Sequence, residues 1–223
     1  MIVKTYTPFI TQKRPAFTII ELMLVIIVLG ILASLAIPRL DRDLRQEVAD
    51  NVLSSIRYTQ HLALMDDKSQ TMDNDWNQEF WTIRFSSDGN DGYFYTISSN
   101  TDHNTNVDKD ETAIDPKNGY YFYNLGGDNI IDEDETPSIF LGKNFGVNSV
   151  KFSGGCGANN TKYIAFDHLG RPYKSGIFSD NDLFQGYMTA DCIITFGFLS
   201  DGDADDLNMS IRIVKETGYA YIQ

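Results

Sequence analysis

The feature that most constrains this chain is a 21-residue apolar run from Phe17 to Ile37, which contains a single carboxylate, Glu21. A helix of this length spans roughly 31 Å, which matches the hydrocarbon core of a bilayer. A charged side chain at membrane depth is disfavoured by about 2.5–3.5 kcal/mol, so such an acid usually has a partner and a role. We therefore expect a transmembrane helix over residues 17–37 and a partner for Glu21.

A cut between Ala16 and Phe17 would supply such a partner. The run contains no Lys, Arg or His, but the cut would create an amino group four residues before Glu21. In an assembly of identical helices, the amine of Phe17 on one subunit can meet the carboxylate of Glu21 on its neighbour. If such a cut occurs, the spacing therefore predicts an assembly contact between Phe17 and Glu21.

The same stretch resembles the class III signal of the type IV pilin and pseudopilin superfamily. A basic leader ends in Lys-Arg-Pro-Ala (residues 13–16), and Phe-Thr-Ile-Ile-Glu-Leu (17–22) opens the helix. Gly30 and Pro38 also match positions where pilin helices carry Gly and Pro, and Pro38 should bend the helix without ending it. One departure is Ala16, where the family normally has Gly. The resemblance implies removal of residues 1–16 by prepilin peptidase and possible N-methylation of Phe17.

Two other interpretations of the N-terminus remain open. A secretory signal would be cleaved after Ala36 and would leave a soluble protein. Against it, Glu21 interrupts the apolar region that such a signal needs, and the helical pattern continues beyond Ala36. A plain signal anchor would give the same topology as a pilin but leaves Glu21 without an explanation.

Charge predicts orientation and excludes one class of partner. Lys4, Lys13 and Arg14 precede the apolar run, so the positive-inside tendency keeps the N-terminus in the cytoplasm and places the globular part in the periplasm. Removing residues 1–16 takes away these three cations and no acid, which changes the net charge from −13 to −16. Because nucleic-acid binding depends on cations that neutralise phosphates, we expect no nucleic-acid partner.

The apolar pattern changes period twice after the membrane segment. Apolar residues recur at spacings of three and four from Leu40 to Ile56, which is typical of an amphipathic helix that packs on a sheet. We expect one helix over 17–66, followed by a β-rich domain over 67–223. The predicted fold class is thus α+β, with a long N-terminal helix on an antiparallel β domain.

Alternating aromatic and β-branched residues predict the strands. Residues 79–86 and 93–98 form a predicted hairpin, with Trp81, Ile83 and Phe85 on its core side. A polar insertion follows at about 99–138. The expected later strands cover 149–152, 162–167, 192–198, 208–215 and 219–222.

Two C-terminal stretches resemble the H-type minor pseudopilins of type II secretion and related minor pilins. Residues 163–172 read Tyr-Ile-Ala-Phe-Asp-His-Leu-Gly-Arg-Pro, an apolar strand followed by a turn, and residues 209–222 resemble the family's last hairpin with Gly218 in the turn. The resemblance implies a minor pseudopilin, with a minor pilin of a type IV or competence pilus as the alternative. Other pilins or pseudopilins, prepilin peptidase and the bacterial inner membrane are the implied partners.

The two cysteines, Cys156 and Cys192, lie in the exported part. Thiols are normally oxidised there, so we expect one disulfide, although two free thiols remain an alternative. A metal site at these cysteines is disfavoured because no Cys-x-x-Cys pair or histidine cluster accompanies them.

Acidic clusters offer a possible calcium site, but neither has the spacing of an EF-hand. We expect solvated acidic loops and no cofactor. The candidate ligands are Asp128, Asp132, Asp134, Asp201, Asp203 and Asp205.

No enzyme motif is present: the sequence has no Gly-x-Ser-x-Gly, no His-Glu-x-x-His and no glycine-rich phosphate loop. We therefore expect a non-catalytic protein. A membrane-anchored binding module outside the cytoplasm is a further alternative to a fibre subunit.

Overall fold

The computed structural model describes residues 18–68, 76–90, 92–103, 107–156, 162–174, 186–198 and 208–223, with the backbone alone at 35–43 and 77. The chain divides into two compact units, residues 1–43 and 44–223. The predicted leader and cleavage site at Ala16 and Phe17 lie outside the described residues.

One long N-terminal helix is followed by a domain of antiparallel sheets, which confirms the α+β class. Two four-stranded antiparallel sheets form, with strand orders β2-β1-β4-β5 and β3-β6-β7-β8. The elements are α1 (Ile19–Met65), η2 (Trp76–Gln78), β1 (Trp81–Ser87), β2 (Tyr93–Ser98), η3 (Lys109–Glu111), η4 (Leu125–Gly127), η5 (Pro137–Ile139), α2 (Leu141–Phe145), β3 (Val147–Gly154), β4 (Tyr163–Phe166), β5 (Pro172–Lys174), β6 (Cys192–Phe198), β7 (Met209–Ile213) and β8 (Ala220–Ile222).

Helix α1 begins at the apolar run and continues through Pro38. Proline removes one backbone donor but does not end this helix, as predicted. The side chains around Pro38 are not described, so the bend there stays a prediction. In the part of the chain that the structure describes, no helix is long and apolar enough to qualify as a membrane span. The crossing by residues 17–37 therefore also stays a prediction.

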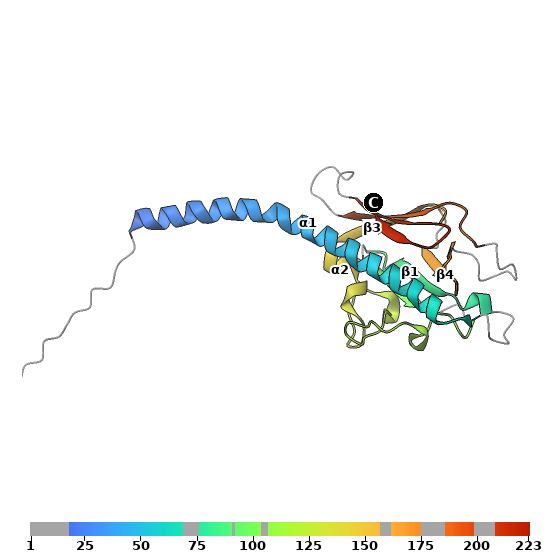
Figure 1. Ribbon diagram of the computed structural model, residues 1–223. Helices are drawn as coiled ribbons and strands as arrows, with labels where there is room; N and C mark the ends of the chain where they lie inside the picture. The colour runs from blue at the N-terminus through green and yellow to red at the C-terminus, as the bar shows by residue number, and fades with distance from the viewer. Residues whose placement is uncertain are drawn as a thin grey trace, which may run out of the picture. The chain divides into compact units, whose positions relative to one another are not determined.

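The second half of α1 is amphipathic and ends at Met65, as the sequence predicted. Leu44 is still 39% exposed, so the buried stripe begins one turn later, at Val48. Its spacing of three and four places one face of the helix on the domain core. Figure 1 shows this half of α1 lying against the strands. The buried members of the stripe are Val48, Ala49, Val52, Ile56 and Ala63.

Both sheets share one core with α1. Phe85 of β1 joins them, because its ring lies 5.7 Å from that of Phe196 on β6 and 5.8 Å from that of Phe152 on β3. Full burial of one such side chain stabilises the fold by about 1.5–3 kcal/mol. The aromatic contacts between the sheets therefore hold the domain together around α1.

The predicted hairpin of β1 and β2 is present, and Ile83 and Phe85 face the core as expected. The opposite face of β1 is covered as well, since Phe80 and Thr82 are also buried. Phe80 belongs to a second, smaller cluster with Ala165 and Tyr173. This cluster covers the outer face of the sheet where β1 begins, which alternation along one strand does not reveal.

The described residues of the insertion over 99–138 differ from a solvated acidic loop. Three of its carboxylates, Glu111, Asp115 and Glu135, are buried. Glu111 accepts hydrogen bonds from the backbone N–H groups of Thr101, Asp102 and Asp108. Backbone donors can satisfy a buried carboxylate as water would. The prediction of a solvated loop covered residues 128–135 and is wrong for Glu135, whereas Glu111 and Asp115 lie outside that stretch. All three acids hold turns of the insertion in place.

Candidate processing and assembly site

The start of α1 is built around Thr18 and Glu21. Thr18 precedes the helix, and its side-chain oxygen Oγ1 accepts a hydrogen bond from the backbone N–H of Glu21 at 3.3 Å. A threonine at this position stabilises a helix start because it satisfies one of the unpaired N–H groups. The carboxylate of Glu21 lies in the first turn, where the positive end of the helix dipole favours an acid.

The apolar side chains of this segment are exposed on every side of the helix. Exposure of the side chains is 82% at Ile19, 75% at Ile20 and 57% at Leu22. A helix that is apolar all round belongs inside a membrane or among other helices. Glu21 is also exposed, and no ion pair joins it to another described residue. The segment therefore has a large apolar surface and one carboxylate available to a partner.

In the domain, Gln60 of α1 joins the two turns that resemble the H-type pseudopilins. Its side-chain nitrogen Nε2 donates to the carbonyl oxygens of Gly170, at 2.8 Å, and Thr217, at 2.7 Å. Gly170 and Gly218 adopt positive φ values of 76° and 67°, a conformation that glycine adopts with little strain. The predicted glycine turn of the last hairpin is thus confirmed, and it packs on α1.

The turn between β4 and β5 is organised by Asp167, whose exposure is only 1%. Its carboxylate accepts hydrogen bonds from the backbone N–H groups of Leu169 and Arg171, and it pairs with the Arg171 guanidinium at 2.7 Å. Tyr173 also donates to this carboxylate. Burial, together with the negative charge of Asp167, raises the pKa of Tyr173 to about 12.

The disulfide between Cys156 and Cys192 is present, as predicted. Cys156 follows the end of β3 and Cys192 opens β6, where it pairs in register with Gly154. Both cysteines are almost completely buried. The bridge therefore fixes one end of the second sheet to the loop that leaves β3.

The calcium candidates are not brought together where the structure describes them. Asp134 lies beside Lys109 in an ion pair, and Asp128 accepts a hydrogen bond from the backbone N–H of Ile130. Among the described residues, no three acidic, histidine or cysteine side chains are grouped closely enough to hold a metal ion. The candidates Asp201, Asp203 and Asp205 lie outside the described residues.

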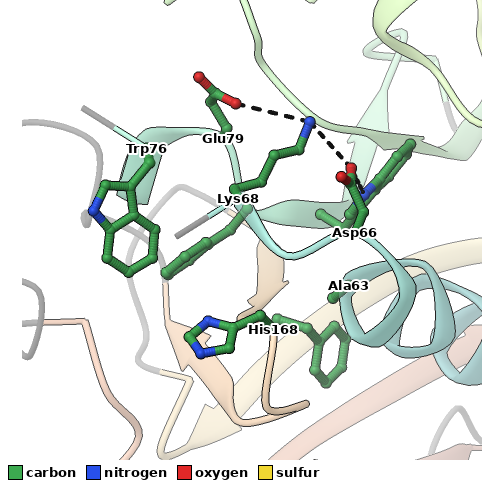
Figure 2. Close-up of a pocket in the computed structure, with 9 residues that line it drawn as sticks. Ala63, Asp66, Lys68, Trp76, Glu79 and His168 are labelled. Atoms are coloured by element: carbon green, nitrogen blue, oxygen red, sulfur yellow. Dashed lines mark hydrogen bonds and ion pairs between the residues drawn. The ribbon is translucent and has the colours of Figure 1, made fainter. Parts of the chain in front are cut away.

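A pocket lies between the end of α1 and the start of β1 (Figure 2). Lys68 reaches between Glu79 and Asp66, with N–O distances of 3.7 and 3.0 Å, while Trp76 and His168 line the opposite side. The pocket holds about 10 Å³, which is close to the space of one water molecule. The ion pairs of Lys68 connect the end of α1 to the segment that precedes β1.

A second pocket, of about 110 Å³, lies between α1 and the insertion, beside Tyr58 and Phe122. Small-molecule sites are usually larger, about 300–1,000 Å³. Beneath it, the hydroxyl of Tyr95 bonds to Ser55 at 2.8 Å and donates to Asn51 at 3.1 Å. Burial raises the pKa of Tyr95 to about 12, so the phenol stays neutral in ordinary conditions and links β2 to α1.

Comparison with known families supports the interpretation of the N-terminus. Residues 12–37 match the family described as the prokaryotic N-terminal methylation motif, which is a type IV pilin-like signal. No curated protein and no solved structure matches the chain. The motif supports the type IV pilin and pseudopilin superfamily for this chain, and with it a pilin-like protein.

The motif carries three further implications for a protein of this class. It implies processing by prepilin peptidase and assembly with other pilins, and it indicates a membrane anchor. The matched range includes Ala16, Phe17, Glu21 and Gly30. The residues that sequence reasoning missed, Gln60 and the buried acids of the insertion, lie outside this range and support the domain.

Proposed function

We propose that this chain is a minor pseudopilin, a structural and assembly subunit of a type II secretion pseudopilus with no catalytic role. The observation that carries the proposal is the exposed apolar surface at the start of α1, which contains a single carboxylate, Glu21. This surface lies within the residues that match the methylation motif. The resemblance of residues 163–172 and 209–222 to H-type subunits favours type II secretion.

In the proposed mechanism, prepilin peptidase cuts between Ala16 and Phe17, and the apolar helix keeps the subunit in the inner membrane. On assembly, the helix leaves lipid and packs among the helices of neighbouring subunits. The carboxylate of Glu21 then pairs with the amino group of Phe17 on a neighbour. Such a pair offsets the cost of about 2.5–3.5 kcal/mol for a charge at membrane depth, and it fixes the axial register of the helices.

The domain contributes contacts with the neighbouring subunits around the fibre. Because Gln60 and the buried stripe from Val48 join α1 to both sheets, force on the second half of the helix reaches the domain directly. The disulfide fixes one end of the second sheet in the oxidising periplasm.

The test is incorporation of a Glu21→Ala variant into fibres. We expect normal cleavage and membrane insertion but at least about a tenfold loss of incorporation, which corresponds to about 1.4 kcal/mol. The matched control is Glu47→Ala, which removes an exposed acid of α1 outside the apolar run. Incorporation of Glu21→Ala at the level of the control would contradict the pairing mechanism.

A minor pilin of a type IV or competence pilus is the alternative, since the methylation motif supports both. Deletion of the gene distinguishes the pseudopilin proposal from the pilin alternative. A type II pseudopilin is required for export of folded proteins to the medium, whereas a minor pilin is required for surface pili or DNA uptake. Co-purification with the subunits of one system and not the other gives the same answer biochemically.

A further inference from the structure

The outer face of the second sheet differs in charge from the rest of the chain. Inward residues such as Ile194 and Ile211 are fully buried, so alternate residues on the same strands point away from the core. We name these outward residues the basic sheet face: Lys151, Ser153, Ile193, Thr195, Ser210, Arg212 and Tyr221.

The four strands of this sheet contain no carboxylate, although the whole chain has 31 acids and a net charge of −13. Lys151 is exposed on β3, and Arg212 is partly exposed on β7. Asp191 lies at the rim, with its Oδ2 atom 3.8 Å from Nη1 of Arg212. The charged side chains on the strands of this face are therefore the two cations Lys151 and Arg212, and Arg212 is paired with Asp191 at the rim.

Arg57 of α1 extends this face beyond its edge strand β8. Its Nη2 atom donates to the carbonyl oxygen of Ala220 at 2.9 Å, and its guanidinium lies 5.6 Å from the ring centre of Tyr219. Tyr219 in turn stacks on Tyr221, with ring centres 6.0 Å apart and planes inclined by 27°. The arginine and the two rings therefore form one continuous surface.

This surface has the composition of a binding site for protein. Arginine and tyrosine are enriched where interfaces bind most tightly, since both bury a large area in a fixed geometry. Tyr219 is 56% exposed despite its stacking, and the backbone contact of Arg57 already holds its side chain in place. Little conformational freedom would be lost when a partner binds.

We propose that the basic sheet face, with Arg57 and Tyr219 at its edge, binds an acidic segment of another polypeptide. Charge complementarity selects the partner, because an acidic segment is attracted to this face and repelled by the rest of the domain. Lys151 and Arg212 lie two strands apart, or about 10 Å across the sheet. A nucleic acid is disfavoured, because its binding depends on many cations that neutralise phosphates and this chain has a net charge of −13. The site does not depend on the fibre role proposed above.

Binding of a synthetic acidic peptide to the full-length protein in detergent micelles tests this proposal. The probe is a fluorescent peptide of alternating Glu and Gly, about 12 residues and about 40 Å long when extended. We expect binding that weakens as salt rises from about 50 to about 300 mM, because screening shortens the reach of the charges. The double variant Lys151→Gln/Arg212→Gln should bind about fivefold more weakly.

The matched control is Lys117→Gln/Lys143→Gln, which changes net charge equally but lies on the insertion and α2. It should lose less than about twofold in affinity, and equal unfolding midpoints for both double variants exclude a folding defect. An equal loss of affinity in both double variants, or no binding of the peptide, would overturn the proposal. Tighter binding of a single-stranded oligonucleotide of the same length at this face would overturn the choice of a polypeptide.

Discussion

Gly218 lies so close to Gly170 that a Cβ atom built on Gly218 would be 2.4 Å from the Gly170 carbonyl oxygen. The side-chain nitrogen of Gln60 would be 2.6 Å from the same Cβ. The last hairpin, the turn after β4 and helix α1 therefore meet at a point where no side chain fits. This contact joins the two C-terminal motifs to the helix that would carry the subunit into a fibre.

Replacing Gly218 by Ala should destabilise the domain strongly. The positive φ alone costs about 1–3 kcal/mol for a residue with a side chain, and the clash with Gly170 adds to it. Gly146→Ala is the control, since Gly146 also has a positive φ but nothing lies within 4 Å of its added Cβ. Urea unfolding should show a larger loss for Gly218→Ala. Equal losses would mean that the close contact contributes nothing.

Gln60→Ala removes both hydrogen bonds that hold the turns on α1. Leaving the carbonyl oxygens of Gly170 and Thr217 without this donor should lower the free energy of unfolding by about 1–3 kcal/mol. Gln46→Ala is the matched control, because Gln46 is exposed and bonds only to Asp50 one turn away among the described contacts. A loss no greater than that of Gln46→Ala would show that the bridge is not needed for stability.

Several of these features could be predicted from the sequence, and others could not. Periodicity predicted the end of α1 at Met65 and the first hairpin, since both depend on residues that are neighbours in the chain. The glycine turn at Gly218 followed from its motif. Gln60 gave no signal, because its partners Gly170 and Thr217 lie 110 and 157 residues away.

The acids of the insertion show a second limit. Glu111 and Glu135 belong to stretches that resemble solvated loops, and only the folded chain shows that backbone N–H groups converge on them. Composition reports the number of charges but not which of them are buried. Asp167 differs, since its turn motif already pointed to a structured position.

Stability should fall at high pH because of Tyr95. Its pKa is about 12 in the folded protein and about 10 in the unfolded chain. Between about pH 10 and about pH 12 the unfolded chain has lost the phenol proton of Tyr95, whereas the folded protein retains it. The contribution to stability is therefore complete below about pH 10 and is lost as the pH rises through the folded pKa. The full effect is about 2–3 kcal/mol.

Urea unfolding at about pH 8 and about pH 11 measures this effect. Tyr95→Phe should be less stable at pH 8 by about 0.5–1.5 kcal/mol, because it loses its hydrogen bonds, but its stability should fall less towards pH 11. Tyr120→Phe, at an exposed tyrosine, should retain the fall of the unmodified protein. An unchanged fall in Tyr95→Phe would contradict this assignment.

Loss of the disulfide should destabilise the second sheet. The bridge closes a separation of 36 residues, and the chain-entropy estimate for such a loop is about 4 kcal/mol. Cys156→Ser/Cys192→Ser should lower the free energy of unfolding by an amount of this order, and reductant should then have no further effect. Stability equal to that of the oxidised protein would show that the bridge is dispensable.

The central claim is that the N-terminal segment is a processing site, a retained anchor and an assembly contact. Mass spectrometry of the mature protein from its native membrane tests it most directly. Our account predicts a chain that starts at Phe17, with or without a methyl group on its amine, so that the new amine lies four residues from Glu21. A start at Ile37, which would indicate a secreted domain, or an intact Met1, which would indicate a plain anchor, would contradict it.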